Sequence, residues 1–213
     1  MRISKTVALL ALSLFFLVGC GKSEVSPVVN TTVKSSNTAT TTNSSNSLTN
    51  PSVSTSKYSA PGILPAEQIQ NKQIRIKTAK GDIVFELYPD TAPITVSNFV
   101  YLTQQKYYDG LTFHRREEGF VIQGGDPLGN GTGGPGYTIE EELNDNYTYQ
   151  HGTVAMAKTR APHSTGSQFF IMLADVSLDK SYTIFGKVIE GLDIVDQIKI
   201  GDVMTEVVVE DKK

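Results

Sequence analysis

The chain has 213 residues, with 19 Lys or Arg, 22 Asp or Glu, and one cysteine. This slightly acidic balance argues against a nucleic-acid-binding surface, which is normally strongly basic. A single cysteine excludes an internal disulfide and a cysteine-based metal site, so the fold must be stabilised by a packed core.

The N-terminal residues 1–19 have the pattern of a secretory signal. Two basic residues precede an apolar run from Val7 to Val18, which is too short to span a bilayer well. The run ends in Leu-Val-Gly-Cys at 17–20, which is similar to a bacterial lipobox. That resemblance implies a diacylglyceryl group on Cys20, which becomes the first residue of the mature chain. An ordinary signal peptide followed by an unmodified cysteine is the alternative.

A lipid on Cys20 would hold the protein at an extracytoplasmic membrane surface without a transmembrane helix. Each buried methylene contributes about 0.8 kcal/mol and one acyl chain binds only marginally, so stable anchoring takes two or three chains. Removing residues 1–19 leaves 17 basic against 22 acidic residues, a net charge of −5. The expected partners therefore include membrane lipid and exclude nucleic acid.

Residues 20–65 are expected to form a disordered tether after the lipid-anchored cysteine. Ser, Thr and Asn supply 18 of the 25 residues from Ser26 to Asn50. Such a composition cannot bury enough apolar surface to offset the entropy of ordering it. A flexible coil of about 45 residues reaches about 35–40 Å root-mean-square, which would lift a folded domain off the lipid surface.

Residues 66–213 are predicted to form the folded domain. Gln73 to Thr78 alternates apolar and polar residues and forms a hairpin with Ile83 to Leu87. Pro93 begins a helix whose apolar residues recur at helical spacing until about Tyr107.

A second hairpin follows, with strands expected at 111–115 and 120–123. Because side chains two apart on a strand share a face, Phe113 and Arg115 should point the same way, as should Val121 and Gln123. An arginine aligned with aromatic residues and a glutamine is an unusual core and indicates a binding surface.

The remaining strands are expected at 152–157, 168–173, 183–188 and 206–210, with a helix at 191–198. About eight strands and two helices in some 140 residues predict a mainly β fold, a closed or nearly closed antiparallel barrel. Gly129 to Gly134 fits a dinucleotide-binding template, but no helix follows it, so it is assigned to a loop. The three histidines lack ligand spacing, so neither a metal nor a cofactor is expected.

Several motifs of this domain, in order along the chain, resemble the signature segments of cyclophilins, the peptidyl-prolyl cis/trans isomerases. They are Phe-His-Arg at 113–115, Gly-Phe-Val-Ile-Gln-Gly-Gly-Asp at 119–126, Gly-Thr-Gly-Gly at 131–134, Met-Ala at 156–157, Gly-Ser-Gln-Phe-Phe-Ile at 166–171 and Phe-Gly-Lys-Val at 185–188. The resemblance implies an eight-stranded antiparallel barrel capped by two helices, with an active groove on its outer wall.

The resemblance also implies roles for single residues. Arg115 would be catalytic, because its guanidinium would bind the prolyl nitrogen of the twisted peptide bond. Gln123 would hold the substrate backbone, with Gln168 beside it as a further polar contact. Ala157 and the main chain of Lys158 would pair with the extended peptide. The proline pocket would be lined by Phe113, Phe120, Val121, Phe170 and Leu178, with Tyr182 at a position where a histidine often lines the groove.

Four departures from the family pattern are visible. A charged turn, Arg116-Glu117-Glu118, replaces an apolar run, and Val121 stands where many members have methionine. The segment between Met156 and Gly166 is one residue longer than the common pattern. Ser177 occupies the position of the tryptophan that binds cyclosporin in the family, so weak cyclosporin binding is expected.

The expected function is a monomeric, lipid-anchored prolyl isomerase that acts on proline-containing polypeptides and helps exported proteins to fold. The alternative from another class is a proline-peptide-binding or chaperone module with little turnover. A lipoprotein that captures small solutes is disfavoured, because about 140 folded residues are too few for the usual two-lobed binding protein.

Overall fold

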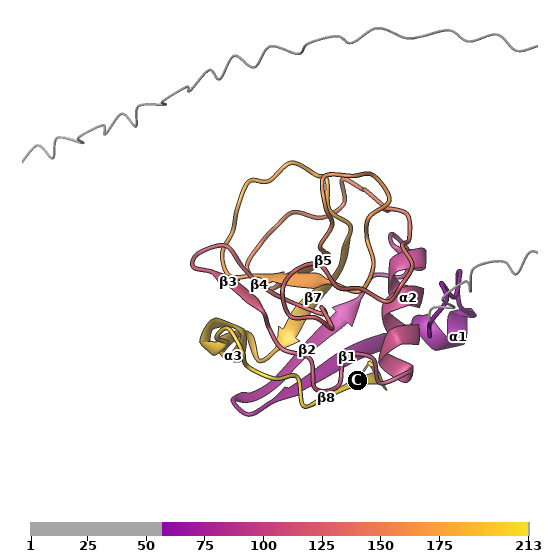
Figure 1. The fold of residues 1–213 in the computed structure, drawn as a ribbon. Coiled ribbons are helices and arrows are strands. Elements are labelled where there is room, and N and C mark those ends of the chain that lie inside the picture. Colours follow the sequence, from indigo (N-terminus) through magenta and orange to yellow (C-terminus); the bar gives the residue numbers. More distant parts are fainter. Residues whose placement is uncertain (1–56, 213) are drawn as a thin grey trace, which may run out of the picture. The chain divides into compact units, whose positions relative to one another are not determined.

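The computed structural model describes residues 57–212, which form an eight-stranded antiparallel sheet and three helices (Figure 1). The strands are β1 (Lys72–Thr78), β2 (Gly81–Leu87), β3 (Arg115–Glu117), β4 (Val121–Gly124), β5 (Thr153–Met156), β6 (Phe169–Met172), β7 (Ile184–Glu190) and β8 (Glu206–Asp211). The helices are α1 (Ala66–Ile69), α2 (Pro93–Gln104) and α3 (Leu192–Gln197). The mainly β fold class is confirmed. The two predicted helices are α2 and α3, and the one-turn α1 is an addition.

The strands follow the order β3-β4-β6-β5-β7-β2-β1-β8, so β3 and β8 are the edges of the sheet. The segments that lead into these edge strands are hydrogen-bonded to each other. Gly110 N–H donates to Met204 O at 2.8 Å, and Phe113 N–H donates to Asp202 O at 2.9 Å. Two bonds in the opposite sense accompany them, from Met204 N–H to Leu111 O and from Gly201 N–H to Phe113 O. The sheet is therefore curled into a nearly closed barrel.

The barrel interior holds the larger of two apolar clusters in the described residues. Alternation along β1 buries Ile74 and Ile76 completely, as the sequence pattern predicts. Helix α2 adds Val96 and Phe99 from one face, and the Phe99 ring meets that of Phe85 edge to face at 5.6 Å. Burying each such side chain contributes about 1.5–3 kcal/mol, which is how a domain without disulfides is stabilised.

The N-terminus of α2 is capped by a residue far along the chain. Pro93 occupies the first turn, where a missing N–H costs nothing. The next two N–H groups, of Ile94 and Thr95, each donate to the Glu142 carboxylate at 2.8 Å.

In Figure 1, α2 and α3 lie on opposite sides of the barrel.

Residues 57–65, which composition assigns to the tether, lie against the domain. The Tyr58 ring meets Tyr107 edge to face at 5.2 Å, and Leu64 N–H donates to Ser97 Oγ at 2.9 Å. Residues 1–19, Cys20 and the rest of the predicted tether up to residue 56 lie outside the described residues. Between residues 57 and 212, no helix has the length and apolar character needed to cross a bilayer.

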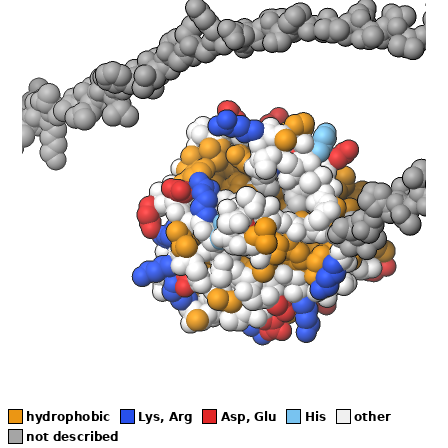
Figure 2. Space-filling model, in the orientation of Figure 1, with side chains coloured by type: hydrophobic (Ala, Val, Ile, Leu, Met, Phe, Trp, Pro, Cys, Tyr) orange, Lys and Arg blue, Asp and Glu red, His pale blue; other side chains and the backbone are white. Residues whose placement is uncertain are grey.

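One face of the described residues can be followed in Figure 2. Figure 2 shows Lys and Arg interspersed with Asp and Glu, and apolar side chains gathered in separate patches. Such a surface agrees with the near balance of acidic and basic residues in the sequence.

Candidate active site

Arg115 lies at the start of β3 and pairs in register with Gln123 on β4. Its Nη1 donates to Gln123 Oε1 at 3.2 Å, and its Nε lies 3.5 Å from Glu117 Oε1. The side chain of Arg115 is 42% exposed, so its guanidinium can still meet a ligand.

A small hollow of about 130 Å³ lies beside Arg115 on the outer wall of the barrel. Its lining residues are Arg115, Phe120, Val121, Gln123, Ala157, Lys158, Phe170 and Tyr182. Pockets for drug-sized ligands are typically about 300–1,000 Å³, so this one fits a single small ring or side chain.

The hollow belongs to a second apolar cluster, separate from the barrel interior. Strand alternation explains the separation, because Val121 belongs to this outer cluster and the next residue, Ile122, to the inner one. The Phe170 ring meets the Tyr182 ring edge to face at 5.4 Å, and Tyr182 N–H donates to the Tyr149 hydroxyl at 3.2 Å. These contacts fix the aromatic walls.

The charged turn after Arg115 is tied to the rest of the domain. Arg116 makes a two-pronged ion pair with Glu118 at 2.7 and 2.9 Å. Its Nη1 also donates to Ile198 O at 2.7 Å, immediately after α3. The hairpin that carries Arg115 is therefore held on its sheet side, where β4 pairs with β6, and on its outer side, through Arg116.

The structure brings together most of the residues that the sequence singled out. All eight residues that line the hollow were predicted as site residues. Leu178 packs against the same outer cluster, and Gln168 Oε1 accepts a hydrogen bond from Gln123 Nε2 at 2.9 Å.

Phe113 is the exception, and its predicted place in the pocket is wrong. Its side chain is completely buried in the barrel interior, where it meets the Phe169 ring at 6.4 Å. The prediction assumed one continuous strand from 111 to 115, but β3 begins only at Arg115. Phe113 is bonded instead to the segment before β8, so alternation from Arg115 does not reach it.

Glu141 does not line the hollow but contacts Lys158, which does, and the sequence analysis missed it. Its nearly buried carboxylate lies 3.3 Å from Lys158 Nζ and accepts the His163 backbone N–H at 3.2 Å. Burial opposes its charge, but hydrogen bonds from His163 and Lys158 outweigh burial and lower the pKa of Glu141. The run of three glutamates at 140–142 contains no local signal that distinguishes this one.

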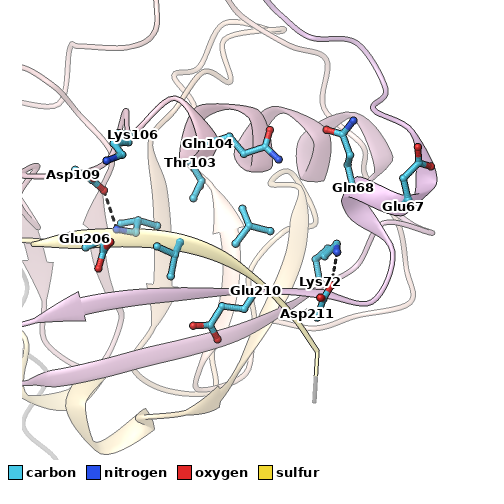
Figure 3. A pocket seen from close by; sticks show the side chains of 13 residues that line it. Glu67, Gln68, Lys72, Thr103, Gln104, Lys106, Asp109, Glu206, Glu210 and Asp211 are labelled. Carbon is cyan, nitrogen blue, oxygen red and sulfur yellow. Dashed lines mark hydrogen bonds and ion pairs between the residues drawn. The ribbon is translucent and has the colours of Figure 1, made fainter.

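A separate hollow of about 440 Å³ runs along β8 and the end of α2 (Figure 3). Three of its acidic side chains are in ion pairs, Asp211 with Lys72, Glu206 with Lys77 and Glu210 with Arg75. Asp109 accepts the Val207 N–H at 2.9 Å. None of the predicted site residues lines it. In residues 57–212, no three His, Cys, Asp or Glu side chains are grouped so that they could hold a metal ion.

Comparison with known proteins identifies the family of the folded part of the chain. Residues 73–213 match the family model described as cyclophilin type peptidyl-prolyl cis-trans isomerase/CLD. The chain is 51% identical over 130 residues to peptidyl-prolyl cis-trans isomerase B of Bacillus subtilis. This match covers 60% of this chain and 90% of that protein. It is 47% identical over 137 residues to a peptidyl-prolyl cis-trans isomerase of Helicobacter pylori, covering 62% and 83%.

A solved structure shares the fold. The crystal structure of a Cryptosporidium parvum cyclophilin type peptidyl-prolyl cis-trans isomerase, in the presence of the dipeptide Ala-Pro, is similar with a TM-score of 0.61 and 34% identity. The match covers 65% of this chain and 98% of that one. The motifs, the barrel and the relatives agree, and the chain belongs to the cyclophilin family of peptidyl-prolyl cis-trans isomerases.

Proposed function

We propose that Arg115 and the outer-wall hollow catalyse rotation about the bond before proline in exported polypeptides, at a membrane surface to which Cys20 anchors the chain. The observation that carries the proposal is the position of a partly exposed guanidinium at the edge of a ring-sized apolar hollow. The proposal has three parts, which are the catalysed reaction, the substrate, and the location of the protein.

The reaction needs no nucleophile, metal or general base. A peptide bond resists rotation with a barrier of about 18–20 kcal/mol because its C–N bond has partial double-bond character. Uncatalysed rotation before proline therefore takes tens to hundreds of seconds. A catalyst must bind the twisted amide more tightly than either planar isomer.

Arg115 is suited to that task. In the twisted amide the prolyl nitrogen regains a lone pair, and a guanidinium N–H can donate to it, whereas the conjugated nitrogen of a planar amide is a poor acceptor. A hydrogen bond from a charged donor is worth about 1.5–3 kcal/mol, or roughly 10- to 150-fold in rate when it forms only in the twisted state.

The hollow and its polar rim would hold the substrate. A pyrrolidine ring would enter between Val121 and Phe170, while Gln123 and the main chain of Ala157 and Lys158 bind the neighbouring peptide backbone. The related structure solved in the presence of Ala-Pro supports a proline-containing peptide as ligand. Ser177 stands in place of the family tryptophan, which supports weak binding of cyclosporin. The single barrel domain supports a monomer.

The N-terminal sequence supports the proposed place of action. The signal-like residues 1–19, the Leu-Val-Gly-Cys motif and the Ser/Thr/Asn-rich segment support a lipid on Cys20 and a domain held outside the cytoplasm. Mass spectrometry of the mature N-terminus tests this part. An unmodified Cys20, or a retained residue 1, would refute the anchor and leave the isomerase untouched.

A protease-coupled assay with a proline peptide tests the chemistry. The wild-type chain should accelerate isomerisation, and Arg115→Ala should lose most of the acceleration while it keeps peptide affinity within a fewfold. Equal, negligible rates for both proteins would instead identify a proline-peptide-binding module.

A further inference from the structure

We propose that a hydrogen-bond relay, which begins at Asp126 and passes through two loop carbonyls, Gln168 and Gln123, orients the Arg115 guanidinium for catalysis. Asp126 and Gln168 are then positioning residues that act through other groups. The inference rests on the proposed role of Arg115 and adds how that side chain is held.

The donors and acceptors of the relay follow one direction, which is set by the glycine-rich loop at residues 128–134. Gln168 Nε2 lies 3.0 Å from Gly131 O and 2.9 Å from Gly133 O. Carbonyl oxygens only accept hydrogen bonds, so the amide nitrogen of Gln168 must face the loop. Its Oε1 therefore faces the other way, toward Gln123.

The same logic fixes the next amide. Gln123 Nε2 donates to Gln168 Oε1 at 2.9 Å, which leaves Gln123 Oε1 to accept from Arg115 Nη1 at 3.2 Å. A guanidinium only donates, so an oxygen is required at that position. Both amides are thus set in the one orientation that satisfies every link.

The loop owes its shape to a buried carboxylate. Asp126 is 1% exposed, and it accepts the backbone N–H of Leu128 at 2.8 Å, of Asn130 at 3.0 Å, and of Gly131. Burial opposes its charge, but these donors outweigh burial and lower the pKa of Asp126.

The close packing of the loop on this carboxylate requires glycine. Gly131 has φ +89°, in the left-handed region, and a Cβ on Gly133 would collide with Asp126 Oδ1. The carbonyls of Gly131 and Gly133 are thereby held toward Gln168. Asp126 therefore anchors the loop end of the relay.

Arg115 needs such a constraint because it has a competing partner. Glu117 Oε1 lies 3.5 Å from Arg115 Nε, on the rim of the groove, and both side chains are substantially exposed. If Gln123 turned its amide nitrogen toward the guanidinium, two donors would face each other and Arg115 would be free to move toward Glu117. The relay keeps the guanidinium on the side of the hollow.

The first test is Gln168→Met, which keeps the length of the side chain and removes both of its hydrogen-bonding ends. We expect kcat of the full chain to fall about 10-fold, in line with the sensitivity of rate to small misplacements, with KM changed less than 2-fold. Gln168→Glu provides a second variant of native size. Its carboxylate loses the bonds to the loop carbonyls but still accepts from Gln123 Nε2, which keeps Gln123 Oε1 toward Arg115, so its kcat should fall less than that of Gln168→Met.

Gln197→Met is the matched control. Gln197 Nε2 also donates to a backbone carbonyl, that of Asp193 at 3.0 Å, but it lies on α3 and does not line the hollow. This variant should keep wild-type kcat and KM, and unfolding midpoints measured for all variants confirm that they are folded.

A double-mutant cycle with Gln123→Glu separates the relay from a general structural role. A glutamate accepts through either oxygen, so its orientation toward Arg115 does not depend on Gln168. In the Gln123→Glu background, Gln168→Met should therefore leave kcat unchanged. An equal fall in kcat in both backgrounds, or no fall in the wild-type background, overturns the relay. A wild-type rate for Arg115→Ala would instead overturn the proposed function itself.

Discussion

Arg115 and Gln123 face each other across the β3–β4 hairpin, and the guanidinium donates to the glutamine oxygen at 3.2 Å. The pairing follows from strand register, so the site is built on the wall of the barrel rather than on a free loop. Residues on strands are held more accurately than residues on loops, which a reaction driven by differential binding requires.

Arg115→Lys should retain the charge and lose the activity. A lysine ammonium cannot bind Gln123 and a substrate nitrogen in the fixed fork geometry of a guanidinium. We expect kcat/KM to fall about 10- to 100-fold in the protease-coupled assay. The unfolding midpoint should stay within a degree or two, because the wild-type side chain is 42% exposed. Full activity in Arg115→Lys would show that positive charge alone suffices.

Phe170→Ala should weaken substrate binding as well as stability. The ring is 5% exposed and forms one wall of the hollow, so truncation enlarges the hollow and costs about 3–5 kcal/mol of unfolding free energy. KM for a proline peptide should rise at least about fivefold. Met172→Ala, on the same strand and in the same cluster, is the control, because it does not line the hollow. A similar rise in KM for both variants would mean that stability, not ring recognition, sets KM.

The local part of this architecture could be predicted from the sequence. Period-two patterns and turn residues located the strands of 73–87 and 152–210 to within about two residues. The family motifs identified every residue that lines the hollow. Strand alternation then separates Val121, on the outer wall, from Ile122 in the interior.

The long-range part could not be predicted. Phe113 turns inward because its backbone pairs with Asp202, nearly ninety residues later, and no local pattern reports that pairing. Glu142 caps α2 from 48 residues away, and Glu141 beside it restrains Lys158 instead. Three consecutive glutamates therefore look alike in the sequence and differ in the fold.

Glu142→Gln should destabilise the domain and leave catalysis intact. The carboxylate satisfies two N–H groups at the start of α2, where negative charge is also favoured by the helix dipole. Loss of such a cap costs about 0.5–2 kcal/mol, measurable as a lower urea midpoint. Glu140→Gln, at an exposed neighbour, should leave that midpoint unchanged. A large drop in kcat for Glu142→Gln would contradict a purely structural role.

His114 should make the fold sensitive to mild acid. Both of its ring nitrogens are buried, and no hydrogen-bond partner for them occurs in residues 57–212. Burial lowers the pKa of His114 from its ordinary value of 6.5. The negative charge of Asp126 partly opposes this shift, and the positive charge of Arg115 adds to it. The unfolded state therefore binds a proton at a higher pH than the folded state does. This contribution to stability is complete above pH 6.5 and is lost as the pH falls toward the lower pKa.

Urea unfolding at pH 7.5, 6.5 and 5.5 measures this effect. The free energy of unfolding of the wild-type chain should decrease across that series. His114→Phe, which fills the same space and does not titrate, should show a smaller decrease. Parallel curves for the two proteins would assign the acid sensitivity to other groups. His151→Phe is the control variant. His151 is partly exposed and its Nε2 lies 2.8 Å from Asp196 Oδ1. The variant removes this exposed contact and should leave the pH dependence due to His114 in place.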